Sequence, residues 1–174
     1  MSQYLVLAIG NTLLADDGVG AKVLDQLQRS RSIPADTRAV DGGTLGFSLA
    51  GEFDDCDGLI VVDASHMSAA PGTVRCFDGD EMDEQLQSSG RSVHEVGLSD
   101  LLDIARLTGR LPRHRVLIGI EPDKVAWGET LSPQVAAAVP VAAGMVGELL
   151  DSWRGVALGA LRPESSQPAG GIVL

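Results

Sequence analysis

Two adjacent acids follow the first apolar segment of the chain, and they constrain what this part of the molecule can bind. Residues 4–9 are almost continuously apolar, Gly10-Asn11 ends the run, and Asp16-Asp17 follow after a short turn. A run of this kind is typical of a central strand that is covered on both faces. Phosphate-binding α/β proteins place glycines and backbone N–H groups between such a strand and its helix, because a helix N-terminus attracts anions. Two carboxylates there would repel a phosphate, so the segment favours a cation.

Short apolar runs alternate with segments of helical periodicity along the rest of the chain. Strands are expected at residues 4–9, 37–40, 58–62, 74–77 and 116–120. Helices are expected where apolar residues recur every three or four positions, around residues 19–27, 45–53, 98–105 and 135–150. This order predicts a three-layer α/β/α sandwich on a mainly parallel five-stranded sheet, with residues 74–77 as an antiparallel edge strand. Pro140 is expected to kink the last helix or to split it in two.

Length and composition indicate a single domain. The chain has 174 residues and a formal net charge of −11, which opposes nonspecific binding to nucleic acid or to anionic membranes. Residues 1–153 are expected to form the domain, and residues 154–174, which are richer in Gly, Pro and Ser, are expected to form a flexible tail. No apolar run is expected to have the length of a membrane span, and no basic signal region leads the chain, so a cytoplasmic protein is expected.

The candidate functional residues gather at the ends of the expected strands, where ligands bind in sheets of this kind. Asp16 and Asp17 follow the first strand, Asp41 ends the second and Asp63 ends the third. His94 lies in the first turn of a helix that begins with a capping box, a Ser followed three residues later by a Glu. Two carboxylates and one imidazole form a suitable set for a borderline divalent ion, with positions left for water or substrate.

Most of these residues also have a purely structural interpretation. One of Asp16 and Asp17 could be the N-cap of the following helix, although both cannot cap the same end. Asp41 could brace the Gly-Gly turn that follows it. His94, taken alone, could be an exposed residue of a first helical turn. His66, in the loop after the third expected strand, is a rival metal ligand.

Several short motifs follow one another in a fixed order along the chain. They are Gly10-Asn11, Leu13 and Asp16-Asp17-Gly18-Val19-Gly20, then Asp41-Gly42-Gly43-Thr44, Val61-Val62-Asp63-Ala64, His94-Glu95-Val96-Gly97-Leu98, Gly119-Ile120-Glu121-Pro122 and Leu131-Ser132-Pro133-Gln134-Val135. Together they resemble the hydrogenase maturation proteases, the endopeptidases that trim the C-terminus of nickel–iron hydrogenase large subunits. The resemblance covers nearly the whole chain up to about Trp153, and the ordered set is far more specific than any one motif.

The resemblance implies a metal-dependent endopeptidase whose metal contacts come from Asp17, Asp63 and His94. The metal it implies is nickel already inserted in the substrate, a nickel–iron hydrogenase large-subunit precursor, so that cleavage reports completed nickel loading. Other divalent ions are expected to fit the same ligands. The segment that begins at Asp41 corresponds to one associated with substrate recognition or cleavage, and Asp41 is the first candidate for a general base. The family often has Glu at the position of Asp17.

Two other functions stay open on the sequence alone. A noncatalytic nickel-binding or chaperone module that docks on the hydrogenase precursor would use the same three ligands. A nucleotide-binding enzyme of the same fold class has less support, because the chain has no GxGxxG motif and acids stand where a phosphate would bind. No Ser–His or Cys–His nucleophile is indicated. Cys56 and Cys76 form no CxxC pair and are expected to be reduced thiols.

Overall fold

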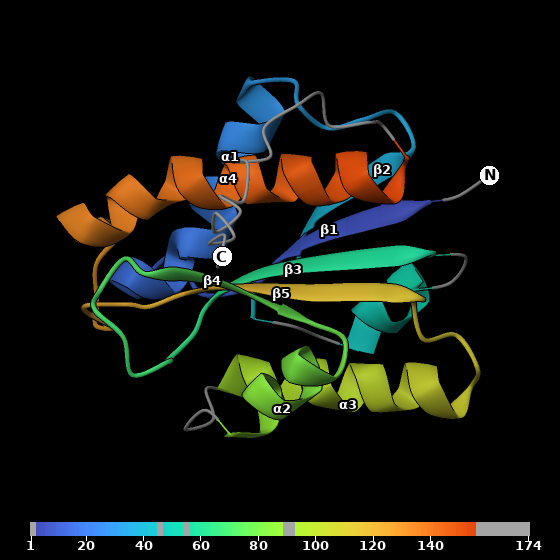
Figure 1. Ribbon diagram of the computed structural model, residues 1–174. Coiled ribbons are helices and arrows are strands. Elements are labelled where there is room, and N and C mark those ends of the chain that lie inside the picture. The colour runs from blue at the N-terminus through green and yellow to red at the C-terminus, as the bar shows by residue number, and fades with distance from the viewer. Residues whose placement is uncertain (1–2, 45–46, 54–55, 89–92, 156–174) are drawn as a thin grey trace, which may run out of the picture.

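Five strands form one mixed sheet in the computed structural model, which describes residues 3–44, 47–53, 56–88 and 93–155 (Figure 1). The strands are β1 (Tyr4–Ala8), β2 (Thr37–Asp41), β3 (Gly58–Ala64), β4 (Val74–Asp78) and β5 (His114–Ile120). Their order across the sheet is β2-β1-β3-β5-β4. The first four strands in this order are parallel, and β4 pairs antiparallel with β5 at the edge. The predicted sheet, with its antiparallel edge strand, is confirmed.

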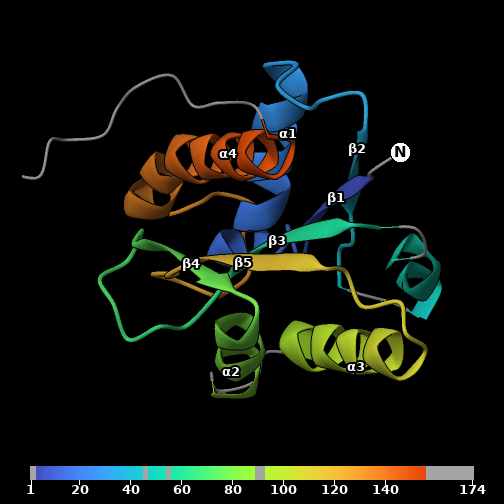
Figure 2. The same cartoon turned by 45° about the vertical axis from the view of Figure 1, so that its right-hand side comes forward.

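Helices cover both faces of the sheet, as two views of the molecule show (Figures 1 and 2). One face carries α1 (Val19–Arg29) and α4 (Pro133–Trp153). The other face carries the short 3₁₀ helix η2 (Phe47–Phe53), α2 (Asp80–Ser88) and α3 (Val93–Leu107). Each layer buries its apolar side chains against the sheet, so two separate cores result. The predicted three-layer sandwich is confirmed.

Successive side chains of each strand point to opposite faces of the sheet, and this decides which helical layer each side chain packs against. On β3, Val62 and Ala64 belong to the core under α1 and α4, whereas Leu59 and Val61 belong to the core under α3. Because successive side chains of a strand point to opposite faces, Asp63 shares the face of Val61. Asp63 therefore lies on the side of the sheet that α3 covers.

The last helix, α4, is continuous. Ser132 is its N-cap residue and Pro133 opens it, as the sequence predicts. The expected split at Pro140 is wrong, because the helix runs unbroken from Pro133 to Trp153 with the proline inside it. A proline removes one helical hydrogen bond and crowds the preceding turn. Packing of the helix against α1 and the sheet offsets that local cost, since most helix stability in proteins comes from tertiary contacts.

Helix α4 is also long and apolar enough, by length and composition, to cross a membrane. The expectation that no apolar segment has this length is therefore wrong for α4. In the structure Val135, Ala142, Val146 and Leu150 are buried in the core with residues of α1 and the sheet. A helix that packs in the core needs the same apolar composition, so its packing accounts for the sequence.

The chain leaves α4 through a turn at Arg154 and Gly155. Arg154 Nε donates a hydrogen bond to Asp36 Oδ2 at 3.0 Å, which ties this turn to the loop before β2. The rest of the expected flexible tail, from residue 156 to residue 174, lies outside the described residues.

Candidate functional site

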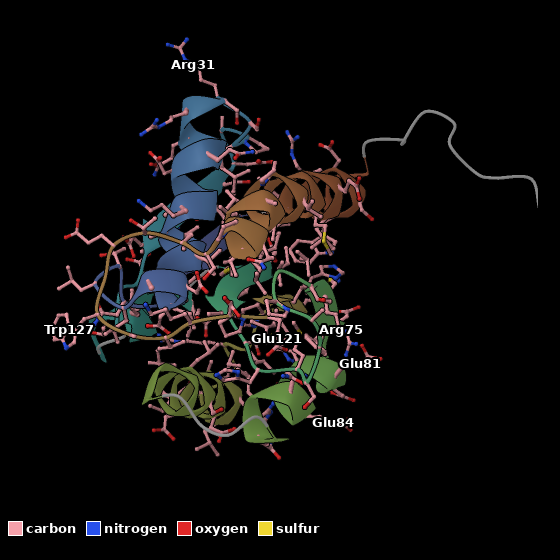
Figure 3. All side chains as sticks on the ribbon, turned by 90° about the vertical axis from the view of Figure 1, so that its left-hand side faces the viewer. Arg31, Arg75, Glu81, Glu84, Glu121 and Trp127 are labelled. Atoms are coloured by element: carbon pink, nitrogen blue, oxygen red, sulfur yellow. The ribbon has the colours of Figure 1, made fainter. Side chains whose placement is uncertain are left out.

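The four parallel strands end at one edge of the sheet, and Figure 3 views the molecule from that side. β2 ends at Asp41, β3 ends one residue after Asp63, and Glu121 directly follows β5. Glu121 lies near the middle of this view and Trp127 lies to one side of it (Figure 3). The acids that were expected at the carboxyl ends of the strands therefore share this edge of the molecule.

The backbone of Asp17 and the side chain of Asp63 both lie close to Gly10. Gly10 has a φ of +126°, and a Cβ there would overlap the backbone carbonyl oxygen of Asp17 and lie 3.8 Å from Asp63 Oδ1. Only glycine therefore fits at this position beside the backbone of Asp17. Asn11 N–H donates to Asp17 Oδ2 at 2.7 Å. Asp17 is 6% exposed and Asp63 2% exposed, so these two predicted metal contacts share one buried corner.

Asp16 holds the loop between β5 and α4. It is fully buried, and its carboxylate accepts hydrogen bonds from the N–H groups of Asp123 (3.0 Å), Lys124 (2.8 Å) and Ser132 (2.6 Å) and from the Ser132 hydroxyl (2.7 Å). Burial alone would raise the pKa of Asp16, but these hydrogen bonds outweigh it and hold the pKa below its ordinary value. The N-cap of α1 is Gly18, without a side-chain cap. The interpretation of either acid as the cap of α1 is therefore wrong.

Asp41 braces the turn that follows β2. Its Oδ1 accepts the N–H of Gly43 at 2.9 Å, and the Gly43 carbonyl accepts the N–H of Gly10 at 2.9 Å. The strand register places Asp41 opposite Ala8, which in turn lies opposite Val62 of β3. Two strand spacings, roughly 10 Å, therefore separate the backbone of Asp41 from β3. The bracing interpretation is confirmed, and the role of Asp41 as a general base stays a prediction.

His94 is the second residue of α3, and this helix begins at the edge where the parallel strands end (Figure 1). The helix covers the face of the sheet on which Asp63 lies. The side chain of His94 lies outside the described part of the structure, so its role as a third metal contact stays a prediction. Among the side chains that the structure describes, no three His, Cys, Asp or Glu residues form a group that could hold a metal ion.

Glu121 is a buried acid at this edge that sequence reasoning did not select as a site residue. Its Oε2 accepts the N–H groups of Met67 at 2.6 Å and Ala69 at 3.1 Å. Its Oε1 lies 3.4 Å from Nδ1 of His66, the exposed rival ligand. Glu121 thus fixes the loop that follows β3. Its place directly after β5 could have identified it, because ligands bind at the carboxyl end of β5 as they do at the ends of the other parallel strands.

A hollow of about 500 Å³ lies between β4 and α2, lined by Arg75, Cys76, Phe77, Glu81, Glu84 and Gln85. Figure 3 shows Arg75, Glu81 and Glu84 on the other side of Glu121 from Trp127. Gln85 Nε2 donates to Ser65 Oγ at 3.2 Å and to the His66 carbonyl at 3.1 Å. The hollow therefore adjoins the loop that follows β3.

Neither cysteine is suited to act as a nucleophile. Cys56 precedes β3 at the opposite edge of the sheet, and burial raises the pKa of its thiol to about 11. Cys76 lies within β4 at the surface, and partial burial of its thiol, with the nearby Asp78 and Glu81, raises its pKa. The thiolate is the reactive form of cysteine. Both cysteines are free, so the prediction that they form no disulfide is confirmed.

Comparisons with known proteins identify the family of the chain. The family model described as hydrogenase maturation protease matches residues 21–148. The chain belongs to this family. A relative of the maturation protease, the hydrogenase expression/formation protein HupD of Bradyrhizobium diazoefficiens, is 33% identical over 153 residues, which cover 87% of this chain and 80% of that protein. The hydrogenase 2 maturation protease of Escherichia coli is 34% identical over 138 residues, which cover 79% of this chain and 84% of that one.

Solved structures share the fold of the maturation protease. The hydrogenase maturating endopeptidase HybD of E. coli superimposes with a TM-score of 0.79 at 32% sequence identity, and the match covers 86% of this chain and 93% of that one. The chain is therefore an endopeptidase of the hydrogenase maturation family, as its motifs imply. Family membership decides against the noncatalytic module and against the nucleotide-binding enzyme.

Proposed function

We propose that this maturation protease removes the C-terminal extension of a nickel–iron hydrogenase large-subunit precursor after nickel has been inserted. In this proposal Asp17, Asp63 and His94 contact the nickel that the substrate carries, and so place the scissile peptide beside the metal. The observation that carries the proposal is the buried corner beside Gly10, where the backbone carbonyl of Asp17 and the side chain of Asp63 both approach that glycine. The cytoplasm as the place of this reaction is a prediction from the sequence.

The charge of this corner supports the binding of a cation. Asp17 and Asp63 are buried acids that both lie near Gly10, and their negative charges attract a divalent cation. Nickel that arrives inside a folded precursor already has ligands of its own, so two carboxylates and one imidazole are enough protein contacts to recognise it.

The same corner can support peptide hydrolysis. A divalent metal beside the scissile bond polarises its carbonyl oxygen or activates a water molecule. The chain itself must then hold the metal, orient the peptide and accept a proton. We assign the last task to Asp41, whose exposed carboxylate ends β2 at this edge and whose turn fixes the carbonyl that holds Gly10 N–H.

Replacing Asp41 separates its two roles. In Asp41→Asn the amide oxygen can still accept the Gly43 N–H, but the side chain can no longer take a proton from water. We expect Asp41→Asn to lower kcat by roughly 100-fold or more, in the range that general-base catalysis contributes, with an unchanged melting temperature. Asp41→Ala should lower the melting temperature as well, because it also loses the hydrogen bond to the turn. Cleavage by Asp41→Asn at the wild-type rate would mean that Asp41 only braces the turn.

The proposed reaction is tested by weighing the large subunit. The purified protein is mixed with nickel-loaded precursor, and intact-protein mass spectrometry follows the large subunit over time, with a mixture that lacks the protease as the control. We expect one lower mass, together with a released peptide that accounts for the difference. A large subunit that stays at full length while bound to this chain would contradict the proposal and support a docking module instead.

A further inference from the structure

Three exposed apolar side chains lie on two loops at the edge where the parallel strands end. Leu13 belongs to the loop after β1, whereas Val125 and Trp127 belong to the loop between β5 and α4. Trp127 is 82% exposed and lies at one side of this edge (Figure 3). Single apolar residues on a surface are common, but several of them together mark an interaction site. Tryptophan is also enriched among the residues that dominate the binding energy of protein interfaces.

Backbone hydrogen bonds join the two loops into one unit. The N–H of Gly128 donates to the Leu13 carbonyl at 3.0 Å, and the N–H of Ala15 donates to the Gly128 carbonyl at 2.6 Å. Trp127, the neighbour of Gly128 in the chain, is therefore fixed beside the loop that carries Leu13. We call Leu13, Val125 and Trp127 the apolar edge patch.

The buried carboxylate of Asp16 holds the longer loop in place. It binds Asp123 and Lys124 before Trp127 in the sequence and Ser132 after it, so the segment that carries the tryptophan is tied at both ends. Groups that are ordered before binding lose less conformational entropy when a partner docks. The backbone that carries Val125 and Trp127 is therefore ordered before a partner arrives.

The apolar edge patch adjoins the proposed active site. The N–H of Asp17 donates to the Leu14 carbonyl at 3.2 Å, and Leu14 forms a backbone bridge with Gly128, the residue after Trp127. The backbone of Asp17 is thus hydrogen-bonded to Leu14, and Leu14 is bridged to Gly128, the residue that follows Trp127. A protein substrate that reaches Asp17 must also approach this patch.

We infer that the apolar edge patch, with Trp127 as its main anchor, is the docking surface for an apolar region on the nickel-loaded hydrogenase large-subunit precursor. The inference rests on the proposed function, which supplies the partner. It extends that function by assigning substrate affinity to a surface outside the buried corner of Asp17 and Asp63, which we call the acid corner. Loss of the patch should therefore weaken binding of the precursor without altering the chemistry at the corner.

Trp127→Ala tests the inference, with Leu107→Ala as a matched control. Leu107 is 87% exposed but ends α3 at the opposite edge of the sheet (Figure 1). Binding of nickel-loaded precursor is measured by biolayer interferometry, and KM and kcat are measured by mass spectrometry of the product. We expect Trp127→Ala to weaken binding and raise KM by roughly 10-fold or more, as for an interface anchor, with kcat unchanged. Trp127→Phe should recover part of the loss, and Leu107→Ala should match the wild type.

The outcomes distinguish failure of the patch from failure of the proposed function. Wild-type binding and cleavage by Trp127→Ala would overturn the docking inference and leave the proposed function standing. A wild-type protein that binds the precursor without cutting it would overturn the proposed function, and weaker binding by Trp127→Ala alone would then still support the patch. A wild-type protein that neither binds nor cuts the precursor would overturn both. Equal losses in Trp127→Ala and Leu107→Ala would also overturn the patch, because its position would then not matter.

Discussion

Replacing Asp17 or Asp63 by asparagine is expected to abolish processing of the nickel-loaded precursor while the protein stays folded. Each substitution keeps the size of the side chain but removes the charge that attracts a cation. Loss of a group that only positions a metal ligand already costs about 10- to 100-fold, so we expect kcat/KM to fall by at least about 100-fold in each variant. Because both acids are proposed to contact one metal, the double variant should lose little more than either single variant.

These variants are compared by mass spectrometry of the large subunit and by circular dichroism of the protease. Asp25→Asn serves as the control, since Asp25 is an exposed acid that pairs with Arg29 on the surface of α1. It should cleave at the wild-type rate. Asp17→Asn with full activity and an unchanged fold would mean that Asp17 is not a metal contact. The same result for Asp63→Asn would exclude the proposed corner as a whole.

Asp16→Asn is expected to have the opposite profile, a large loss of stability. The asparagine must place an amide group, which donates hydrogen bonds, among donors that now point at a carboxylate. Since hydrogen bonds to buried charges are worth about 1.5–3 kcal/mol and unmatched donors cost as much again, we expect the free energy of unfolding to fall by about 2–4 kcal/mol. Denaturant unfolding measures this loss, and Ser132→Ala should lose less because it removes only the hydroxyl contact.

The pH dependence of unfolding provides an independent readout for Asp16. A carboxylate with a lowered pKa stabilises the folded state above its ordinary pKa of 3.8, and this contribution is lost as the pH falls toward the lower folded pKa. The stability advantage of the wild type over Asp16→Asn should therefore be constant near neutral pH and shrink in acid below 3.8. A difference that stays constant down to acid unfolding would contradict the assigned role of the Asp16 hydrogen bonds.

The sheet could be predicted because most of its strands appear in the sequence as nearly continuous apolar runs. The runs that became β1, β3 and β5 end at glycines or acids, and the buried strands begin and end within two residues of the expected positions. The unbroken α4 could not be predicted. The local cost of Pro140 can be read from the sequence, whereas the tertiary packing that offsets this cost cannot.

The acid corner could be predicted in part. Asp16, Asp17, Asp41 and Asp63 were selected by their places at the ends of parallel strands, which meet at one edge, and the family resemblance singled out Asp17 and Asp63 as metal contacts. The hydrogen-bond partners of Asp16 could not be predicted, since they lie 107, 108 and 116 residues further along the chain. Nothing local distinguishes the two acids. The loop that Asp16 holds in place, which carries Trp127, could not be predicted from any local sequence pattern either.

The central claim is that the acid corner recognises nickel carried by the substrate, and one comparison tests it most directly. Identical amounts of precursor, one sample loaded with nickel and the other kept nickel-free, are incubated with the wild-type protein and followed by intact-protein mass spectrometry. We predict that the nickel-loaded large subunit shortens and that the nickel-free one keeps its full mass. Addition of nickel to the protease alone should not rescue cleavage of the nickel-free sample. Equal cleavage of the two precursors would contradict the claim.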